Sequence, residues 1–65
     1  MKELESMLLG LIEDGEIAEN IIYRIFWNYK ASKIRSALHY LEKEAYVMRV
    51  DQGGAFYMPN EGVHA

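Results

Sequence analysis

The polar side chains of residues 30–43 form the group with the clearest chemical potential in this sequence. Hydroxyl, imidazole, guanidinium and ammonium groups recur there at helical spacing: Lys30, Ser32, Lys33, Arg35, Ser36, His39, Tyr40 and Lys43. Cations of this kind bind phosphate oxygens, and an arginine can donate two hydrogen bonds to the edge of a guanine. Lys30, Ser32 and Lys33 also fall at a helix N-terminus, which favours an anion. We therefore predict a nucleic-acid-binding segment; the alternative is an ordinary solvated helix face.

No other set of residues has the spacing of a catalytic or metal-binding site. The chain has no cysteine, and its two histidines, His39 and His64, lie 25 positions apart without clustered carboxylates. Gly53-Gly54 is not followed by a helix whose N-terminus would bind a phosphate. No Ser/His/Asp set or carboxylate pair suggests catalysis. We therefore expect no enzyme activity, no metal, no cofactor and no small-molecule substrate.

The charges of the chain are segregated along the sequence. Residues 1–22 hold one Lys and six acidic residues, a net charge of −5, whereas residues 23–49 hold six basic and two acidic residues, a net charge of +4. The net charge of the whole chain is −3. The local field, rather than the net charge, decides what binds where. We expect the basic segment to face a nucleic acid and the acidic first helix to point away from it.

Three amphipathic segments and one hairpin are predicted to position these side chains. Apolar residues recur at helical spacing over about 2–13, 17–27 and 32–45. A strand is the competing interpretation of the second segment, but its apolar residues come in pairs rather than alternating, which favours a helix. Ser32 is the expected N-cap of the third helix. Residues 46–50 and 55–58 are rich in β-branched and aromatic side chains and flank Asp51-Gln52-Gly53-Gly54, which predicts a tight hairpin over 47–58.

The stretch from Ser32 to Val50, SKIRSALHYLEKEAYVMRV, resembles the recognition helix and first wing strand of winged helix-turn-helix transcriptional regulators. With the upstream helix and the Gly-Gly hairpin tip, the resemblance covers about residues 15–58. It implies an α+β fold of three helices followed by a two-stranded β-hairpin wing. It also implies a double-stranded DNA target, with the recognition helix of about 32–45 in the major groove. Arg49 and Gln52 on the wing, residues 47–58, would touch the DNA backbone or minor groove.

Ala45 departs from the pattern of that family, in which glycine is usual at the exit of the recognition helix. Alanine in a left-handed conformation costs roughly 1 kcal/mol or more. The sequence leaves two alternatives open. Either the helix runs one residue further and the wing leaves at another angle, or Ala45 is strained.

A protein-interaction module without DNA binding is the alternative function, because winged helices also serve that role. Tyr23 and Trp27, four residues apart on the second helix, would then form an exposed aromatic patch for a protein partner or a second copy of the chain. The favoured expectation is instead that the hairpin or the first helix covers Trp27, because tryptophan is mostly buried. A single domain contacts few phosphates, so we expect useful affinity to need a homodimer, a repeated DNA site or a larger complex.

Length and composition predict one small intracellular domain. The chain has 65 residues, of which 51% are hydrophobic, and we assign the domain to residues 1–60 and a flexible C-terminal tail to residues 61–65. The longest apolar run is too short to span a bilayer, and the N-terminus has acids where a secretion signal has a basic patch. We therefore expect a cytoplasmic protein with no membrane partner.

Overall fold

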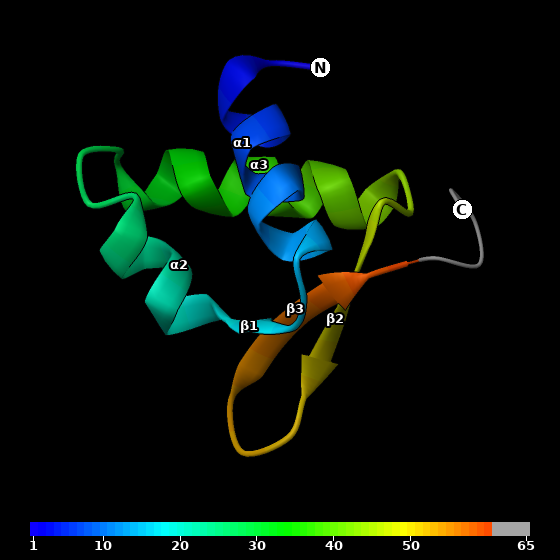
Figure 1. Ribbon diagram of the computed structural model, residues 1–65. Coiled ribbons are helices and arrows are strands. Elements are labelled where there is room, and N and C mark those ends of the chain that lie inside the picture. Colours follow the sequence, from blue (N-terminus) through cyan, green and yellow to red (C-terminus); the bar gives the residue numbers. More distant parts are fainter. Residues whose placement is uncertain (61–65) are drawn as a thin grey trace.

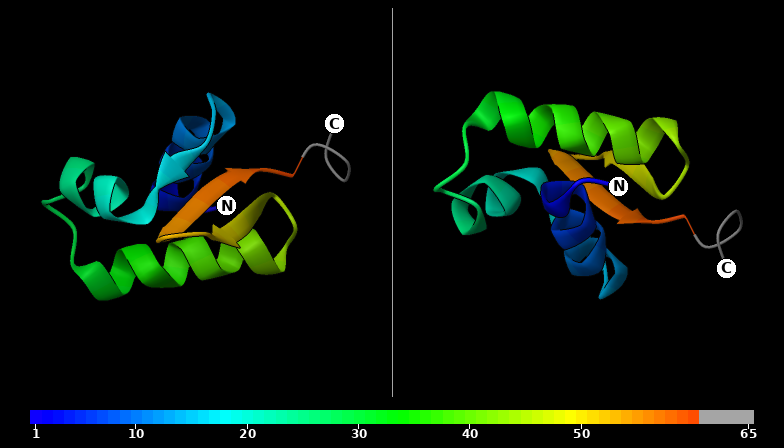
Figure 2. Two further views of the ribbon diagram at one scale, coloured as in Figure 1. Left: turned by 90° about the horizontal axis from the view of Figure 1, so that it is seen from below. Right: turned by 90° about the horizontal axis from the view of Figure 1, so that it is seen from above.

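The computed structural model describes residues 1–60 and has an α+β architecture, as predicted (Figure 1). Its elements follow in the order α1 (Glu3–Glu13), β1 (Ile17–Ala18), α2 (Glu19–Ile25), α3 (Ala31–Lys43), β2 (Val47–Asp51) and β3 (Ala55–Pro59). In the views from below and from above in Figure 2, β3 lies between α1 and α3. The predicted tail, residues 61–65, lies outside the described residues. Within residues 1–60 no helix has the length and apolarity required to cross a membrane.

The sheet has three antiparallel strands in the order β1-β3-β2, so the prediction of a two-stranded sheet was wrong. The additional strand, β1, pairs Ile17 with Tyr57 and Ala18 with Phe56. The predicted hairpin is present: β2 and β3 pair from Val47 with Pro59 to Asp51 with Ala55. Its turn places Gly53 and Gly54 at φ values of 68° and 145°, the positive values that a glycine adopts without steric cost.

The second helix is shorter than the predicted 17–27. Ile17 and Ala18 belong to β1, and α2 ends at Ile25, with Phe26 outside helical geometry at φ −99° and ψ 40°. The β-branched Ile17 suits an extended conformation, and pairing with β3 satisfies the backbone there, which a sequence pattern read locally does not reveal. The strand therefore prevails over the helix at the start of this segment.

The third helix begins at Ala31 and ends at Lys43, within the predicted segment but not at its limits. Lys30, in extended conformation, is the N-cap, and its carbonyl accepts hydrogen bonds from the N–H groups of Lys33 and Ile34 at 3.0 and 3.1 Å. Ser32 lies inside the first turn, so the prediction that it caps the helix was wrong. Ser32 is instead an exposed residue on the surface of the helix.

Ala45 adopts the left-handed conformation, with φ 62°, directly after α3. The N–H of Tyr46 donates to the carbonyl of Leu41 at 2.8 Å, and the N–H of Ala45 donates to the carbonyl of Glu42 at 3.0 Å. These two bonds form a Schellman motif, in which the left-handed position is usually occupied by glycine. The structure thus selects the strained alternative, and the motif sets the direction in which β2 leaves the helix.

The core lies where the three helices meet the inner face of the sheet. Its buried side chains come from every layer: Leu8, Ile12, Ile22, Ile34, Ala37, Leu38, Leu41, Val47 and Tyr57. The apolar stripe predicted for α3 supplies four of them, Ile34, Ala37, Leu38 and Leu41. Because these four residues occupy one side of α3, the opposite side of that helix is held towards solvent.

We predict that Ala45→Gly stabilises the protein by about 0.5–1 kcal/mol, because glycine removes the steric cost of the left-handed conformation and only part of that gain is lost to the greater freedom of the unfolded chain. Urea or thermal unfolding followed by circular dichroism measures the change. The control is Ala31→Gly at the exposed first position of α3, which we expect to leave stability unchanged or lower it. An Ala45→Gly protein no more stable than the parent would contradict the strain.

Candidate nucleic-acid interface

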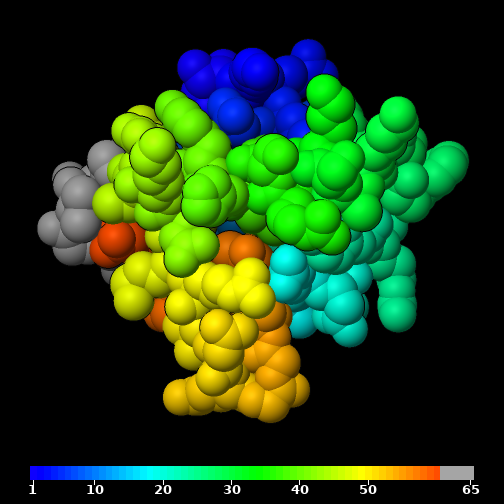
Figure 3. Space-filling model, turned by 180° about the vertical axis from the view of Figure 1, so that it is seen from behind, coloured from blue at the N-terminus to red at the C-terminus, as the bar shows by residue number. Residues whose placement is uncertain are grey.

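The outer face of α3 carries most of the residues predicted to bind nucleic acid. Figure 3 shows this helix crossing the middle of one face of the molecule, with the β2–β3 hairpin beside it. The predicted set is exposed apart from one half-buried member, Tyr40; the exposed residues are Lys30, Ser32, Lys33, Arg35, Ser36, His39, Lys43, Arg49 and Gln52. The structure therefore brings the predicted helix residues together on one accessible surface.

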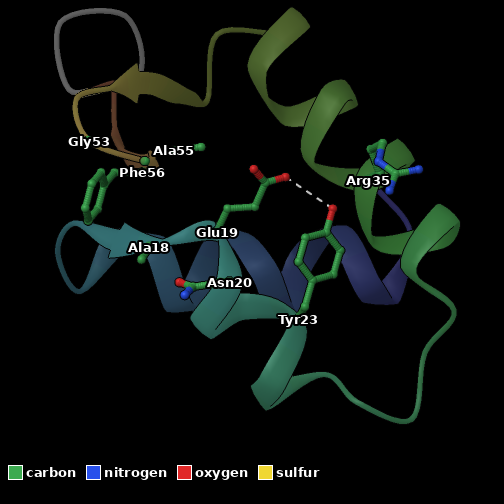
Figure 4. A pocket seen from close by; sticks show the side chains of 9 residues that line it. Ala18, Glu19, Asn20, Tyr23, Arg35, Gly53, Ala55 and Phe56 are labelled. Carbon is green, nitrogen blue, oxygen red and sulfur yellow. Dashed lines mark hydrogen bonds between the residues drawn. The ribbon is translucent and has the colours of Figure 1, made fainter.

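The helical period divides the side chains of α3 into a centre and two edges. Ser32, Ser36, His39 and Lys43 lie opposite the buried stripe and form the centre. Arg35 lies on the edge towards α2 and the hairpin, where it lines an open groove with Glu19 and Tyr23 of α2 and Gly53, Gly54 and Phe56 of the hairpin. Figure 4 shows Arg35 and Tyr23 on different walls of this groove.

Lys33 lies on the opposite edge of α3, next to the N-terminal turn of α1. It lines a shallow pocket with Ser36 of the same helix and with Lys2 and Glu5 of α1. Partial burial raises the pKa of Tyr40 on this edge, and the carboxylates of Glu44 and Glu5 add to the effect. Glu5, in the first turn of the acidic helix, therefore lies beside the basic helix, and the expectation that α1 points away from a nucleic acid stays a prediction.

Electrostatics favour an anionic partner on α3. No acidic residue occurs between Asn20 and Leu41, and the cations Arg24, Lys30, Lys33 and Arg35 fall within that range. Lys43 adds a further cation at the last turn, although Glu42 and Glu44 flank it. The exposed first three turns of α3 are thus uniformly basic or neutral, which is the field that concentrates phosphate groups.

Arg49, a predicted DNA contact on the hairpin, is engaged within the protein. Its Nη1 lies 3.5 Å from the Glu19 carboxylate and donates to the Tyr57 hydroxyl at 3.1 Å, while its Nε donates to Asp51 at 3.4 Å. The guanidinium carbon also lies 5.8 Å from the centre of the Tyr57 ring. Two carboxylates compensate one cation here, so Arg49 offers little net positive charge to a phosphate.

Glu19 connects this cluster to the groove beside α3. Its Oε2 accepts a hydrogen bond from the Tyr23 hydroxyl at 3.2 Å (Figure 4). Its Oε1 lies 3.5 Å from Nη1 of Arg49. Burial raises the pKa of Tyr23, Glu19 adds to the rise, and the positive charge of Arg35 opposes it. Burial likewise raises the pKa of Tyr57, against the hydrogen bond from Arg49. Both phenols are therefore neutral near pH 7; the hydroxyl of Tyr23 donates to Glu19, and that of Tyr57 accepts from Arg49.

Glu19, Asp51 and Tyr57 were not identified from the sequence as part of this surface. Two of them had a local signal: Asp51 follows Arg49 by two positions on the same strand face, and Tyr57 lies opposite Arg49 in the hairpin register. Glu19 had none, because only the pairing of β1 with β3 brings the start of α2 to the hairpin.

The two aromatic residues predicted to bind a partner differ in exposure. Tyr23 is half-buried and bonded to Glu19, whereas 81% of the surface of Trp27 is exposed. The expectation that the hairpin or α1 covers Trp27 was wrong. Because α2 ends at Ile25, Trp27 lies in the turn before α3 and does not share a helical face with Tyr23.

Within residues 1–60 no group of three or more His, Asp or Glu side chains is placed to hold a metal ion. His39 lies on the outer face of α3, with no second histidine among the described residues; the other histidine, His64, lies outside them.

We predict that Glu19→Gln lowers the pKa of Tyr23 towards the ordinary tyrosine value near 10, because the substitution removes the negative charge that disfavours the phenolate. The pKa of Tyr40 has no contribution from Glu19 and serves as the internal control. Alkaline NMR titration of chain labelled with carbon-13 at tyrosine Cζ measures both. An unchanged Tyr23 pKa would show that Glu19 does not face this phenol in solution.

The raised pKa values also set a direction for stability. Between pH 10 and the folded pKa of each phenol the unfolded chain has lost a proton that the folded chain retains, so these phenols contribute a loss of stability as the pH rises through that range. In Glu19→Gln the pH range over which Tyr23 lowers the stability becomes narrower, because the folded pKa of Tyr23 lies closer to 10.

No protein-family model matches the chain, and neither curated proteins nor solved structures gave a match.

Proposed function

We propose that the chain is a winged-helix domain that binds double-stranded DNA, with α3 as the recognition helix and the β2–β3 hairpin as the wing. The order helix, strand, helix, helix, hairpin supports this fold. The observation that carries the proposal is the outer face of α3, which is exposed, free of acidic residues over its first three turns and flanked by a projecting hairpin (Figure 3).

An α-helix fits the major groove of B-DNA, and the residues that read bases there are those on its outer face. Ser36 and His39, at the centre of this face, are suited to base edges or phosphates. Arg35, at the edge nearer the hairpin, has the guanidinium that pairs with guanine. Lys30 and Lys33, at the start of the helix, are suited to the phosphates that border the groove.

The wing contributes through its tip more than through its cations. Gln52 is exposed in the turn, whereas Arg49 is held by Glu19, Asp51 and Tyr57. The carboxylate of Glu19 also lines the groove between α3 and the wing, where it repels a phosphate backbone. We infer that DNA contacts the outer face of α3 and the tip of the hairpin and does not fill this groove.

On this proposal the chain acts as a transcriptional regulator, as the resemblance of residues 32–50 implies. The exposed Trp27 favours an additional role in binding a protein. It lies in the turn before α3 and not on the outer face of that helix.

We predict that the protein binds duplex DNA with a plot of log K against log salt of slope about −3 to −4, because four cations, those of Lys30, Lys33, Arg35 and Lys43, remain available to phosphates. Arg35→Ala should weaken binding to a preferred duplex by on the order of 10-fold and reduce the slope by about 1. Fluorescence anisotropy with labelled duplex at nanomolar protein concentration measures both quantities.

The matched control is Arg24→Ala, which removes the same charge from α2 at an exposed position outside the predicted contact set. It should change the affinity far less than Arg35→Ala. Equal affinity of the parent and the Arg35 variant would remove Arg35 from the interface. Absence of binding to any duplex at low salt, together with unmoved amide signals over residues 30–43, would refute the DNA-binding function.

A further inference from the structure

Gly10 and Trp27 are two residues that the fold of a single chain does not explain. Trp27, the sole tryptophan in the sequence, exposes 81% of its surface. Gly10 lies in the interior of α1 on an exposed face, where glycine weakens a helix relative to alanine. A Cβ atom built on Gly10 meets nothing within 4 Å, so no contact within the chain requires a glycine there. Both residues lie on surfaces without an intramolecular partner.

The surroundings of Trp27 are apolar and basic. Ile25, which ends α2, is 50% exposed, and Ile21 one turn earlier is 36% exposed. Arg24 and Lys30 are exposed on either side of the turn that bears Trp27, at the left edge of the molecule in Figure 1. Apolar side chains with a cationic rim are suited to an acidic surface that presents an apolar notch.

The outer face of α1 has the complementary features. Its exposed residues recur at helical spacing and have acids at the two ends: Glu3, Ser6, Met7, Gly10 and Glu13. The small Ser6 and Gly10 leave a shallow place on the helix, and Met7, 37% exposed, adjoins it. A methionine sulfur packs favourably against an aromatic ring. This face therefore accepts a bulky aromatic side chain between two carboxylates.

We propose that two copies of this chain form a symmetric dimer in which Trp27 of each copy packs on Gly10 of the other. Size and charge are complementary: an exposed indole with Arg24 and Lys30 around it meets a glycine notch with Glu3 and Glu13 around it. One indole buries about 150–250 Å², and a specific interface needs on the order of 1,000 Å² in total. In a dimer with two-fold symmetry both contacts form at once, and the buried area approaches that value when Ile21 and Ile25 are included.

Lys30 is the one proposed DNA contact that also belongs to this interface, because the centre of the outer face of α3 takes no part in it. The dimer is weakened by salt, since its rim is made of exposed opposite charges. It leaves both helices α3 available, so the DNA-binding proposal and the dimer stand or fall separately.

Sedimentation equilibrium of the whole chain at low salt tests the dimer. The expected result is a weight-average mass that rises with concentration from 7.6 kDa towards twice that value. Because the chain has a single tryptophan, the fluorescence emission of Trp27 should shift to shorter wavelength over the same concentration range. A chain that stays monomeric at every concentration overturns the proposal, as does a dimer whose Trp27 emission remains that of a solvated indole.

Two substitutions locate the interface. Trp27→Ser should raise the dimer dissociation constant at least 10-fold without unfolding the chain, because the side chain is largely exposed. Gly10→Gln places bulk in the notch and should raise that constant similarly, while the melting temperature of dilute monomer rises by about 4 °C because glutamine is the better helix former. Met48→Ser, at an apolar residue of the hairpin that is 43% exposed, is the matched control and should leave dimerisation unchanged. Undiminished dimerisation of the Gly10 variant overturns the proposed contact.

Discussion

Tyr57 is the residue at which the three strands, the helical core and the polar cluster meet. It lies on the central strand, β3, opposite Ile17 of β1 on one side and Arg49 of β2 on the other. Only 3% of the surface of Tyr57 is exposed, and its hydroxyl accepts a hydrogen bond from the guanidinium of Arg49. A buried phenol requires a hydrogen-bond partner, so the position of Tyr57 in the core also fixes where the hairpin arginine lies.

The position of Arg49 over Tyr57 determines the charge of the surface next to the hairpin. With Arg49 held over Tyr57, Glu19 and Asp51 are the carboxylates within its reach, and the three groups largely compensate one another. The cations of α3, Lys33, Arg35 and Lys43, are exposed and direct their field towards solvent. The hairpin has one cation and one carboxylate in its sequence, and Glu19 adds a second carboxylate in the fold, so Arg49 adds little positive field to that of the cations on α3.

The extent to which the sequence predicted the fold depends on how local each determinant is. The stripe of Ile34, Ala37, Leu38 and Leu41 has the period of a helix and predicted both the buried and the exposed side of α3 correctly. Strand β1 is different, because two residues have no period, and their conformation is set by Tyr57 and Phe56 about 40 positions later. A prediction that included this pairing would also have had a shorter α2, an exposed Trp27 and Glu19 close to Arg49.

The same strand explains why apolar side chains remain on the surface of α2. A helix over 17–27 would have a broad apolar stripe, but its first two residues belong to β1 instead. In the remaining helix, α2, only Ile22 is buried. Ile21 and Ile25 are left at the surface because a core this small has room for one row of α2 side chains. Their exposure is thus a consequence of the fold. Gly10 of α1 has no such explanation in the fold, since a Cβ atom there meets nothing within 4 Å and alanine would strengthen the helix.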